Sequence, residues 1–267
     1  MVKKKIDRFF KKVIHFFDYL NVGSFVYIAK DLCLFEKNNI YSQQRTLELI
    51  YEKNLSVSRF GDGEIDHCIY PHLDSQWQMS SIDLSINLSE ILVSDNDTLI
   101  TCIPGSNAYD RWWKRYWINN WFPFKNKLDL NKSYGNSFIT RPEFFLTYKE
   151  LGVELWKRIW EKKEVIFITG LNSRFQYGHI LFDNISNYEV VYSKNKNAFS
   201  DFNRLLKILD NENNKEKLFL IALGQTGTVL AYHLNHLGYR SLDIGHIDRS
   251  YDYVFGNGKS PEKVSYK

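Results

Sequence analysis

The chain has few cysteines and no long hydrophobic run, and these two absences exclude several classes of protein. Its three cysteines, Cys33, Cys68 and Cys102, are widely spaced among 267 residues and form no CxxC pair. Neither a disulfide framework nor a zinc ribbon is therefore predicted. No stretch of about 18 apolar residues is present, and the first residues lack the apolar segment and cleavage site of a signal peptide. We expect a cytoplasmic protein that neither spans a membrane nor is exported by that route.

The composition is that of a globular protein with a substantial core. Hydrophobic residues make up 44% of the chain and aromatic residues 16%, enough for one large domain or two small ones. Helix-like and strand-like segments alternate without internal repeats or low-complexity linkers, which predicts an α/β sheet. We assign residues 41–267 to a single α/β domain and residues 1–40 to an N-terminal helix and a connector.

The basic charge is concentrated at the N-terminus. Residues 1–12 carry a net charge of +5, whereas the whole chain has +4, so the remainder carries −1. Within residues 5–20 apolar side chains recur at helical spacing opposite the basic ones, which predicts a basic amphipathic helix. Residues 3–20 are suited to bind an anionic membrane surface, on the inner face of the cell membrane. They are equally suited to pack on the domain or on a second subunit. Nucleic acid is not expected, because no second basic cluster follows.

The most informative stretch is the run SRFGDGE at residues 58–64. A strand-like segment ends there in a turn that carries Asp62 and Glu64. In an extended or turning backbone, residues two apart point the same way, so both carboxylates can offer oxygens to one hard cation such as Mg²⁺ or Mn²⁺. Gly61 lets the backbone approach a ligand, and Arg59 can add a fork of donors for phosphate oxygens. The alternative is an ordinary turn, with Glu64 in the first turn of a following helix.

A second glycine turn follows the continuous apolar run at residues 218–223, which is typical of a strand buried on both faces. The turn and the start of the next predicted helix contain Gly224, Thr226, Gly227 and Thr228. Such a turn is an anion site, because free N–H groups and the positive end of the helix dipole meet there. These residues can hold the phosphates of a nucleotide, or they can form a tight strand-to-helix turn with a threonine cap.

Three further features leave alternatives open. Asp243 follows the next strand at the distance that a Rossmann dinucleotide enzyme needs, so a nucleotide-dependent oxidoreductase or methyltransferase remains an alternative. The tryptophan-rich helix predicted at residues 108–120 suits a core or subunit contact, or a platform for an acceptor sugar. His67, Cys68 and His72 lack the paired spacing of a closed zinc site, and their closeness to the carboxylates favours a position in the pocket wall.

These motifs resemble those of the GT-D fold glycosyltransferases, a bacterial family first catalogued as a domain of unknown function, and the resemblance covers the chain from about Ser56 onward. Its longest motif is ALGQTGTVLAYHLNHLGYRSLDIGHIDRSYDYVF, at residues 222–255. The resemblance implies a Rossmann-like layered sheet with flanking helices, and transfer of a sugar from a nucleotide donor. In a second motif, SRFGDGE, Asp62 and Glu64 are similar to the family's DxE metal motif. The remaining motifs are Thr140-Arg141-Pro142, Ser173-Arg174-Phe175 with residues 181–184, and Asn197-Ala198-Phe199.

The chain departs from the family pattern at three places. Gln225 and Gly227 stand where the family usually has proline and alanine, which keeps the turn but reduces its stiffness. Residues 176–180 differ from the usual Gly-x-Gly-Asn-Asp, so two polar groups that could contact the donor or the acceptor are changed. Ser250 stands two positions after Asp248, where an acidic residue is often seen.

The resemblance and the residues together predict a mechanism. A divalent cation, Mn²⁺ or Mg²⁺, on Asp62 and Glu64 bridges the donor diphosphate and neutralises the leaving nucleoside diphosphate. Asp248 or His246 accepts the proton of the acceptor hydroxyl. A hexose thus moves from a nucleotide-diphosphate sugar, expected to be a UDP-sugar, to a glycan, glycoprotein or lipid-linked acceptor in bacterial surface-glycan assembly. A non-catalytic membrane-docking scaffold is the other class left open. Donor contacts are expected from Arg59, Gly61, Arg141, Arg174, Asn197, Gly224, Thr226, Gly227 and Thr228.

Overall fold

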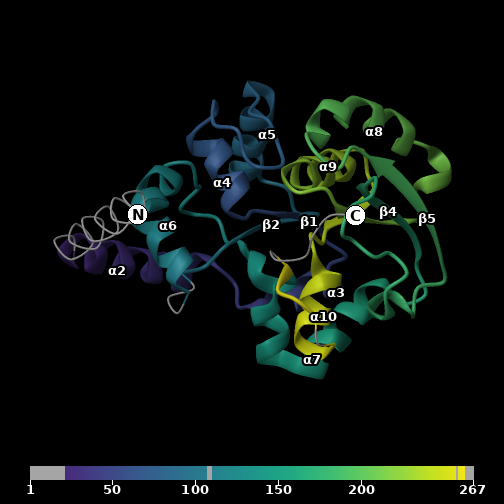
Figure 1. Ribbon diagram of the computed structural model, residues 1–267, viewed down its shortest axis with the longest axis horizontal. Coiled ribbons are helices and arrows are strands. Elements are labelled where there is room, and N and C mark those ends of the chain that lie inside the picture. The colour runs from purple at the N-terminus through teal and green to yellow at the C-terminus, as the bar shows by residue number, and fades with distance from the viewer. Residues whose placement is uncertain (1–21, 107–109, 257, 262–267) are drawn as a thin grey trace, which may run out of the picture.

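A single sheet of seven parallel strands forms the centre of the molecule (Figure 1). The computed structural model describes residues 22–106, 110–256 and 258–261. The strand order is β3-β2-β1-β7-β6-β4-β5, so the first and last strands of the sequence lie side by side in the middle of the sheet. The strands are β1 (Ser56–Arg59), β2 (Leu99–Ile103), β3 (Gly135–Asn136), β4 (Glu164–Gly170), β5 (Asn187–Ser193), β6 (Leu218–Ala222) and β7 (Arg240–Asp243).

Helices cover both faces of the sheet, which confirms the predicted α/β architecture. One face carries α4 (Asp62–Ile69), α5 (Ile82–Val93), α8 (Phe202–Leu209) and α9 (Gln225–His236). The other carries α3 (Gln43–Glu52), α7 (Pro142–Trp160) and α10 (Ile247–Phe255). Two more helices, α2 (Val22–Asn39) and α6 (Arg111–Lys125), pack on each other at one end (Figure 1). Short 3₁₀ turns span Ser137–Thr140, Ile180–Phe182, Ala198–Asp201 and Glu212–Asn214.

Local chemistry explains where several of these elements begin and end. Ser42 caps α3 by accepting the N–H of Arg45 at 3.1 Å. Gly238, with φ +85°, ends α9, as predicted from the need for a left-handed residue after a helix. Every residue of β6 is buried, because β7 and β4 flank it and helices cover both faces. The continuous apolar run therefore predicted this strand correctly.

The structure contains helices that the sequence analysis did not predict. The predicted connector before residue 41 is occupied by α2, whose Leu32 and Phe35 are buried among apolar side chains of α6. Asp31 fixes this contact by accepting hydrogen bonds from Trp121 Nε1 at 2.7 Å and Lys125 Nζ at 2.8 Å. The amphipathic helix predicted at residues 3–20 lies outside the described residues. Among the residues that the structure describes, no helix is long and apolar enough to cross a membrane.

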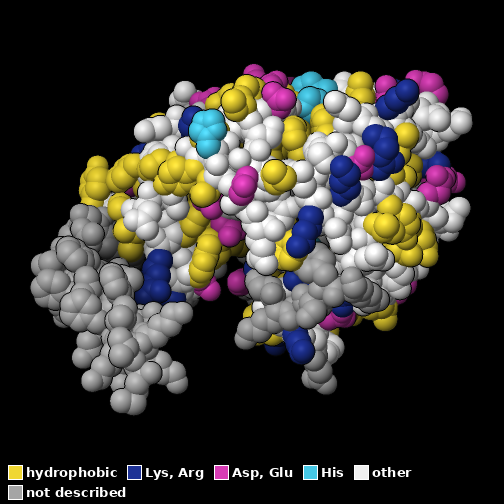
Figure 2. Space-filling view, turned by 45° about the horizontal axis from the view of Figure 1, so that its top comes forward, with side chains coloured by type: hydrophobic (Ala, Val, Ile, Leu, Met, Phe, Trp, Pro, Cys, Tyr) yellow, Lys and Arg dark blue, Asp and Glu magenta, His cyan; other side chains and the backbone are white. Residues whose placement is uncertain are grey.

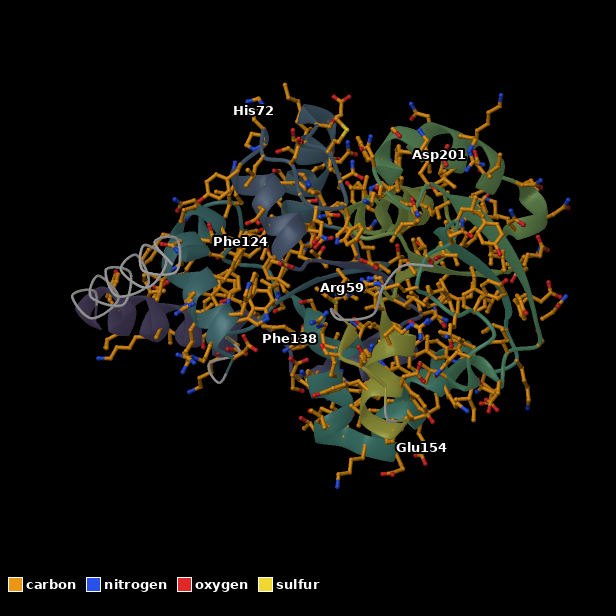
Figure 3. The ribbon with its side chains drawn as sticks, in the orientation of Figure 1. Arg59, His72, Phe124, Phe138, Glu154 and Asp201 are labelled. Carbon is orange, nitrogen blue, oxygen red and sulfur yellow. The ribbon has the colours of Figure 1, made fainter. Side chains whose placement is uncertain are left out.

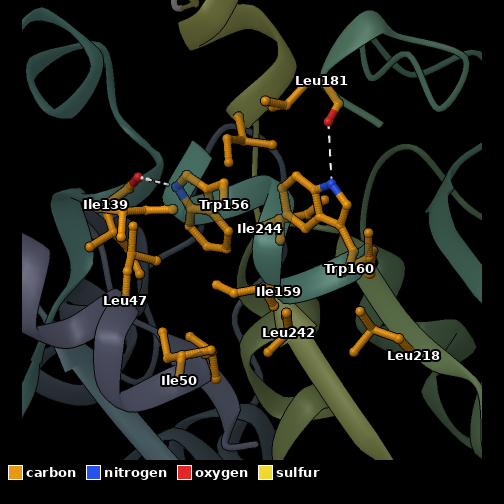
Figure 4. Close-up of a cluster of buried hydrophobic side chains, with 14 of the residues drawn as sticks. Leu47, Ile50, Ile139, Trp156, Ile159, Trp160, Leu181, Leu218, Leu242 and Ile244 are labelled. Atoms are coloured by element: carbon orange, nitrogen blue, oxygen red, sulfur yellow. Dashed lines mark hydrogen bonds between the residues drawn. The ribbon is translucent and has the colours of Figure 1, made fainter. Parts of the chain in front are cut away.

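The largest part of the core lies between α7 and the sheet (Figure 4). Trp156 and Trp160 stack with ring centroids 5.4 Å apart. Each indole N–H is satisfied, since Trp156 donates to the carbonyl of Ile139 at 2.9 Å and Trp160 to that of Leu181 at 3.2 Å. A buried indole combines a large apolar area with one polar atom that needs a partner, and both needs are met here. These contacts hold the part of α7 that follows its kink at Lys149 against the sheet.

Truncation of Trp156 tests this account of the core. We expect Trp156→Ala to lower the free energy of unfolding by about 3–5 kcal/mol, because it leaves a cavity and removes the partner of the Ile139 carbonyl. Leu151→Ala on the exposed face of the same helix is the control, with an expected change within about 0.5 kcal/mol. Urea unfolding followed by far-ultraviolet circular dichroism, rather than by tryptophan fluorescence, measures both changes in stability. A loss below about 1 kcal/mol in Trp156→Ala would contradict the account.

Candidate active site

A cleft of about 710 Å³ opens at the carboxyl edge of the sheet, beside the ends of β1, β2 and β3. Its volume lies within the range of about 300–1,000 Å³ that is usual for small-molecule sites, and its position is usual for ligand sites of parallel α/β sheets. A hollow is visible on the face shown in Figure 2, with acidic side chains, in magenta, at its rim. The lining residues include Arg59, Gly61, Asp62, Glu64, Asp110, Trp112, Trp113, Phe138, Arg141, Glu143, Leu146 and Tyr253.

The predicted metal pair borders this cleft, but the geometry differs from the one predicted. Asp62 and Glu64 are the first and third residues of α4, so they do not lie in an extended backbone. Residues two apart in a helix do not face each other, and the same-side argument was wrong. Asp62 is exposed, whereas Glu64 is buried and its Oε2 accepts the N–H of Gly61 at 2.7 Å. The alternative position, in the first turn of a helix, is the one that the structure shows.

A buried cluster of charges lies under this end of β1. The Arg59 guanidinium lies 3.8 Å from Asp243 Oδ1, and its Nε is buried without a hydrogen-bond partner among the described residues (Figure 3). Burial raises the pKa of Glu64 to about 7, and it raises the pKa of Asp243 as well. Gly245 has φ +52°, and a Cβ there would collide with the Arg59 guanidinium. One guanidinium thus faces two buried carboxylates, which leaves the cluster short of positive charge.

The second glycine turn lies at a smaller hollow of about 80 Å³, at the ends of β4, β5 and β6. Gly224 and His246 border it, but both predicted threonine hydroxyls point inward. Thr226 donates to Gln78 Oε1 at 3.2 Å, and Thr228 donates to the carbonyl of Arg59 at 2.9 Å. With both threonine side chains fully buried, the residues of this turn that border the hollow are Gly224 and Gln225.

Two other predicted donor contacts support neighbouring segments. Asn197 has φ +50°, and its Oδ1 accepts a hydrogen bond from Gln78 Nε2 at 2.6 Å. Arg174 is buried and donates through Nη1 to the carbonyl of Pro261 at 2.7 Å, with Nη2 3.2 Å from His246 Nε2. Gly227, in α9, is buried against Ile221 and Asp243, where a larger side chain would be tight.

The structure corrects the placement of the predicted base. Asp248 is fully buried in the first turn of α10, and its Oδ2 accepts the N–H of Gln176 at 2.9 Å. Burial raises its pKa to about 6. His246 borders the smaller hollow, so neither residue lines the cleft that holds Asp62 and Glu64. Asp248 instead anchors the 174–180 loop to α10.

The remaining predictions divide between cleft and core. Arg141 lies at the start of α7 and borders the cleft. Trp112 also borders it, with half of its surface exposed and its ring stacked on Tyr116 at 5.0 Å, whereas Trp117 is buried. His67 and Cys68 are buried in α4 and, like His72, do not line the cleft, so the predicted position in its wall was wrong.

Several cleft residues carry no sequence signal that we recognised. Phe138, Glu143, Leu146 and Tyr253 come from a 3₁₀ turn, from α7 and from α10, which the fold brings to one edge. They lie in no glycine turn and no charged motif. The Thr140-Arg141-Pro142 motif adjoins Phe138 and Glu143 and was the nearest available signal.

Comparison with known proteins agrees with this architecture. The family profile described as "Glycosyltransferase GT-D fold" matches residues 57–267. The chain belongs to this glycosyltransferase family. Two solved GT-D relatives superpose with TM-scores of 0.80 and 0.76. The first, described as "The highly conserved domain of unknown function 1792 has a distinct glycosyltransferase fold", is 27% identical, and the match covers 91% of this chain and 90% of that one. The second, "A New Glycosyltransferase (DUF1792) from Streptococcus sanguinis", is 28% identical, with 86% and 89% covered.

Two curated proteins of the family are also similar. "Glycosyltransferase GlyD" of Streptococcus pneumoniae serotype 4 (strain ATCC BAA-334 / TIGR4) is 30% identical over 236 residues, which is 83% of this chain and 28% of that protein. "Probable glycosyl transferase Gly" of Streptococcus gordonii is 30% identical over 243 residues, 86% of this chain and 35% of that protein. The chain therefore spans about a third of the length of these relatives.

The burial of Glu64 predicts a pH-dependent cost in stability. A raised pKa means that the folded state holds the proton more tightly than the unfolded state, so stability is lost as pH rises from 4.5 to about 7. Glu64→Gln cannot ionise, and we expect it to be more stable than the wild type by about 1–3 kcal/mol at pH 8. The difference should vanish near pH 4.5. Urea unfolding at both pH values measures it, and a less stable variant at pH 8 would contradict the prediction.

Proposed function

We propose that this chain is a metal-dependent glycosyltransferase that moves a hexose from a nucleotide-diphosphate sugar, with UDP as the nucleotide. The acceptor class we propose is a glycan, glycoprotein or lipid-linked sugar of bacterial surface-glycan assembly. The observation that carries the proposal is the pair of carboxylates in the first turn of α4, at the rim of a 710 Å³ cleft on the carboxyl edge of a parallel sheet. Membership of the GT-D family and the names of its relatives support sugar transfer.

The residues present fit a cation that arrives with the donor. Mg²⁺ and Mn²⁺ at nucleotide sites are held by one or two protein carboxylates, with phosphate oxygens and water completing the shell. The described residues contain no group of three or more side chains that would make a closed metal cage. Asp62 supplies an exposed carboxylate, and Glu64 supplies a buried one whose Oε2 is bonded to the Gly61 N–H. A divalent cation beside Glu64 would also offset the surplus of negative charge that Glu64 and Asp243 share against Arg59. When bound, the cation would neutralise charge on the leaving diphosphate.

The chain's own groups would bind and orient the donor. The α4 N-terminus, at Gly61, directs the positive end of the helix dipole toward the cleft. Arg59 borders the same space and can donate to phosphate oxygens, whereas Arg141, at the start of α7, can donate to the donor sugar. Of the other predicted contacts, Gly224 borders the smaller hollow of about 80 Å³, whereas Arg174 and Asn197 lie behind its wall, against His246 and Gln78.

An apolar part of the cleft suits a sugar. It is lined by Trp112, Trp113, Phe138 and Leu146. The exposed face of Trp112 is fixed by stacking on Tyr116, and Asp110 accepts the backbone N–H of Trp112 at 2.7 Å. Rigid aromatic faces bind the apolar faces of ring compounds at little entropic cost. This wall is our candidate for the acceptor side.

Removal of the metal pair tests the function. Calorimetry with UDP in the presence and absence of MnCl₂ should show Mn²⁺-dependent binding to the wild type. Asp62→Asn and Glu64→Gln should each weaken that binding at least tenfold, about 1.4 kcal/mol, because each removes a charged ligand. Asp83→Asn, an exposed carboxylate in the first turn of α5, is the matched control and should bind as the wild type does.

The outcomes separate the three classes of function. UDP binding of equal strength without metal and in both variants would refute the metal mechanism. Binding of NAD or S-adenosylmethionine, with no response to the Asp62 and Glu64 substitutions, would favour an oxidoreductase or methyltransferase. Absence of binding to a panel of UDP, GDP, CDP and their sugars would favour a scaffold.

A further inference from the structure

Four carboxylates border the main cleft in the part of the chain that the structure describes, and three of them have assigned partners or roles. Asp62 and Glu64 are the proposed metal pair. Asp110 caps α6, and its Oδ1 accepts the N–H groups of Trp112 at 2.7 Å and Trp113 at 3.0 Å. Glu143 is the fourth, and no hydrogen bond or ion pair of the described residues occupies its carboxylate.

The contrast between Glu143 and Glu64 is informative, because both lie in the first turn of a helix. A glutamate at the third position of a helix can accept the N–H of the N-cap residue, as Glu64 does from Gly61, whereas Glu143 is at the second position. Glu143 makes no such bond, and its Oε2 is buried without a donor. A buried acceptor left unpaired costs about 1–3 kcal/mol, and a hydroxyl in the cleft can reach only the other oxygen of this carboxylate, Oε1.

The position of Glu143 is held by a rigid support. It is the second residue of α7, and the next two residues, Phe144 and Phe145, are fully buried in the core. Thr147 Oγ1 donates to the Glu143 carbonyl at 2.8 Å, which also secures this first turn. A catalytic group supported in this way needs little reorganisation during reaction.

The cleft places Glu143 and the metal pair on walls that come from opposite faces of the sheet. Asp62 and Glu64 come from α4 on one face, whereas Glu143 comes from α7 on the other (Figure 1). In a single displacement at a sugar carbon, the nucleophile attacks from the side opposite to the leaving group, and its base lies on that side. The diphosphate at α4 and a hydroxyl at α7 satisfy this requirement.

We propose that Glu143 is the catalytic base of the transfer, and that the reaction inverts the anomeric configuration of the donor sugar. The acceptor hydroxyl gives its proton to the Glu143 carboxylate while its oxygen forms a bond to the anomeric carbon. The bond from that carbon to the phosphate oxygen breaks, and its electron pair leaves with the nucleoside diphosphate. This inference rests on the proposed function, and it assigns to Glu143 the role predicted for Asp248 or His246.

The test uses water as the acceptor, so that the natural acceptor need not be known. Release of UDP from UDP-glucose, UDP-galactose and UDP-N-acetylglucosamine is measured with MnCl₂ for the full chain. Glu143→Gln keeps the shape of the side chain and should lower kcat by about 10²–10⁴-fold, with KM for the donor and calorimetric affinity for Mn²⁺ and UDP within threefold of the wild type. Glu143→Asp restores a carboxylate and should recover at least tenfold of the lost rate.

The matched control is Glu154→Gln, an exposed glutamate on the same helix that lies far from the cleft (Figure 3). It should leave kcat unchanged. Proton NMR within the first minutes of reaction identifies the sugar released from these α-linked donors. The β-anomer is expected first.

The results distinguish failure of this inference from failure of the proposed function. A wild type that neither binds UDP with Mn²⁺ nor releases it from any donor would overturn the proposed function, and the inference with it. If the wild type is active, any of three results would overturn the inference alone. The first is a kcat of Glu143→Gln within threefold of the wild type, and the second is a change in the donor affinity of this variant without a change in its kcat. The third is initial release of the α-anomer.

Discussion

The ion pair of the half-buried Arg59 with the buried Asp243 is the interaction on which the carboxyl edge of the sheet depends. It joins the end of β1 to the end of β7, two strands that are neighbours in space although about 180 residues separate them. Thr228 reinforces the junction, because its hydroxyl donates to the Arg59 carbonyl and lies 3.2 Å from Asp243 Oδ2. Gly245 leaves the space that the guanidinium occupies. The motif at residues 58–64 therefore packs directly against the motif at residues 222–255.

The spacing of Asp62 and Glu64 acquires a different physical meaning in this setting. In an extended chain the pair would be two equal ligands on one side. At the start of α4 they are unequal, since Asp62 is exposed and Glu64 is buried and bonded to Gly61. Asp62 is suited to meet a solvated cation, whereas Glu64 adds charge from below and stabilises the helix end. In the proposed function, the helix dipole would attract the anionic diphosphate and the carboxylates its cation.

In the proposed mechanism, the two walls of the cleft have different roles. The α4 wall carries the charges that would hold a diphosphate, and the α7 wall carries Glu143 beside Arg141 and apolar side chains. Phe144 and Phe145, fully buried beside Glu143, anchor that second wall in the core. Both walls therefore rest on regular elements rather than on loops, which favours precise placement of two substrates.

Sequence patterns predicted those parts of the protein that depend on local chemistry. Alternating segments predicted the α/β class, the apolar run at residues 218–223 predicted β6, and Gly238 predicted the end of α9. The ordered motifs predicted the family correctly, and the glycine-rich run drew attention to the carboxylates that do border the cleft. Each of these features depends on neighbours within a few residues, or on a pattern kept intact along the chain.

Tertiary structure decided which of the polar side chains share a cavity. The local pattern around Asp248 and His246 resembles a catalytic segment, yet burial under the 174–180 loop removes Asp248 from the cleft, and His246 borders the smaller hollow. Glu143 carries no motif, yet the crossing of the chain from β3 through α7 brings it to the cleft wall. Burial and proximity between distant residues follow from strand order and helix packing. The residue pattern within a single segment does not show which distant residues will be neighbours. The residues that line the cleft therefore became known only from the fold.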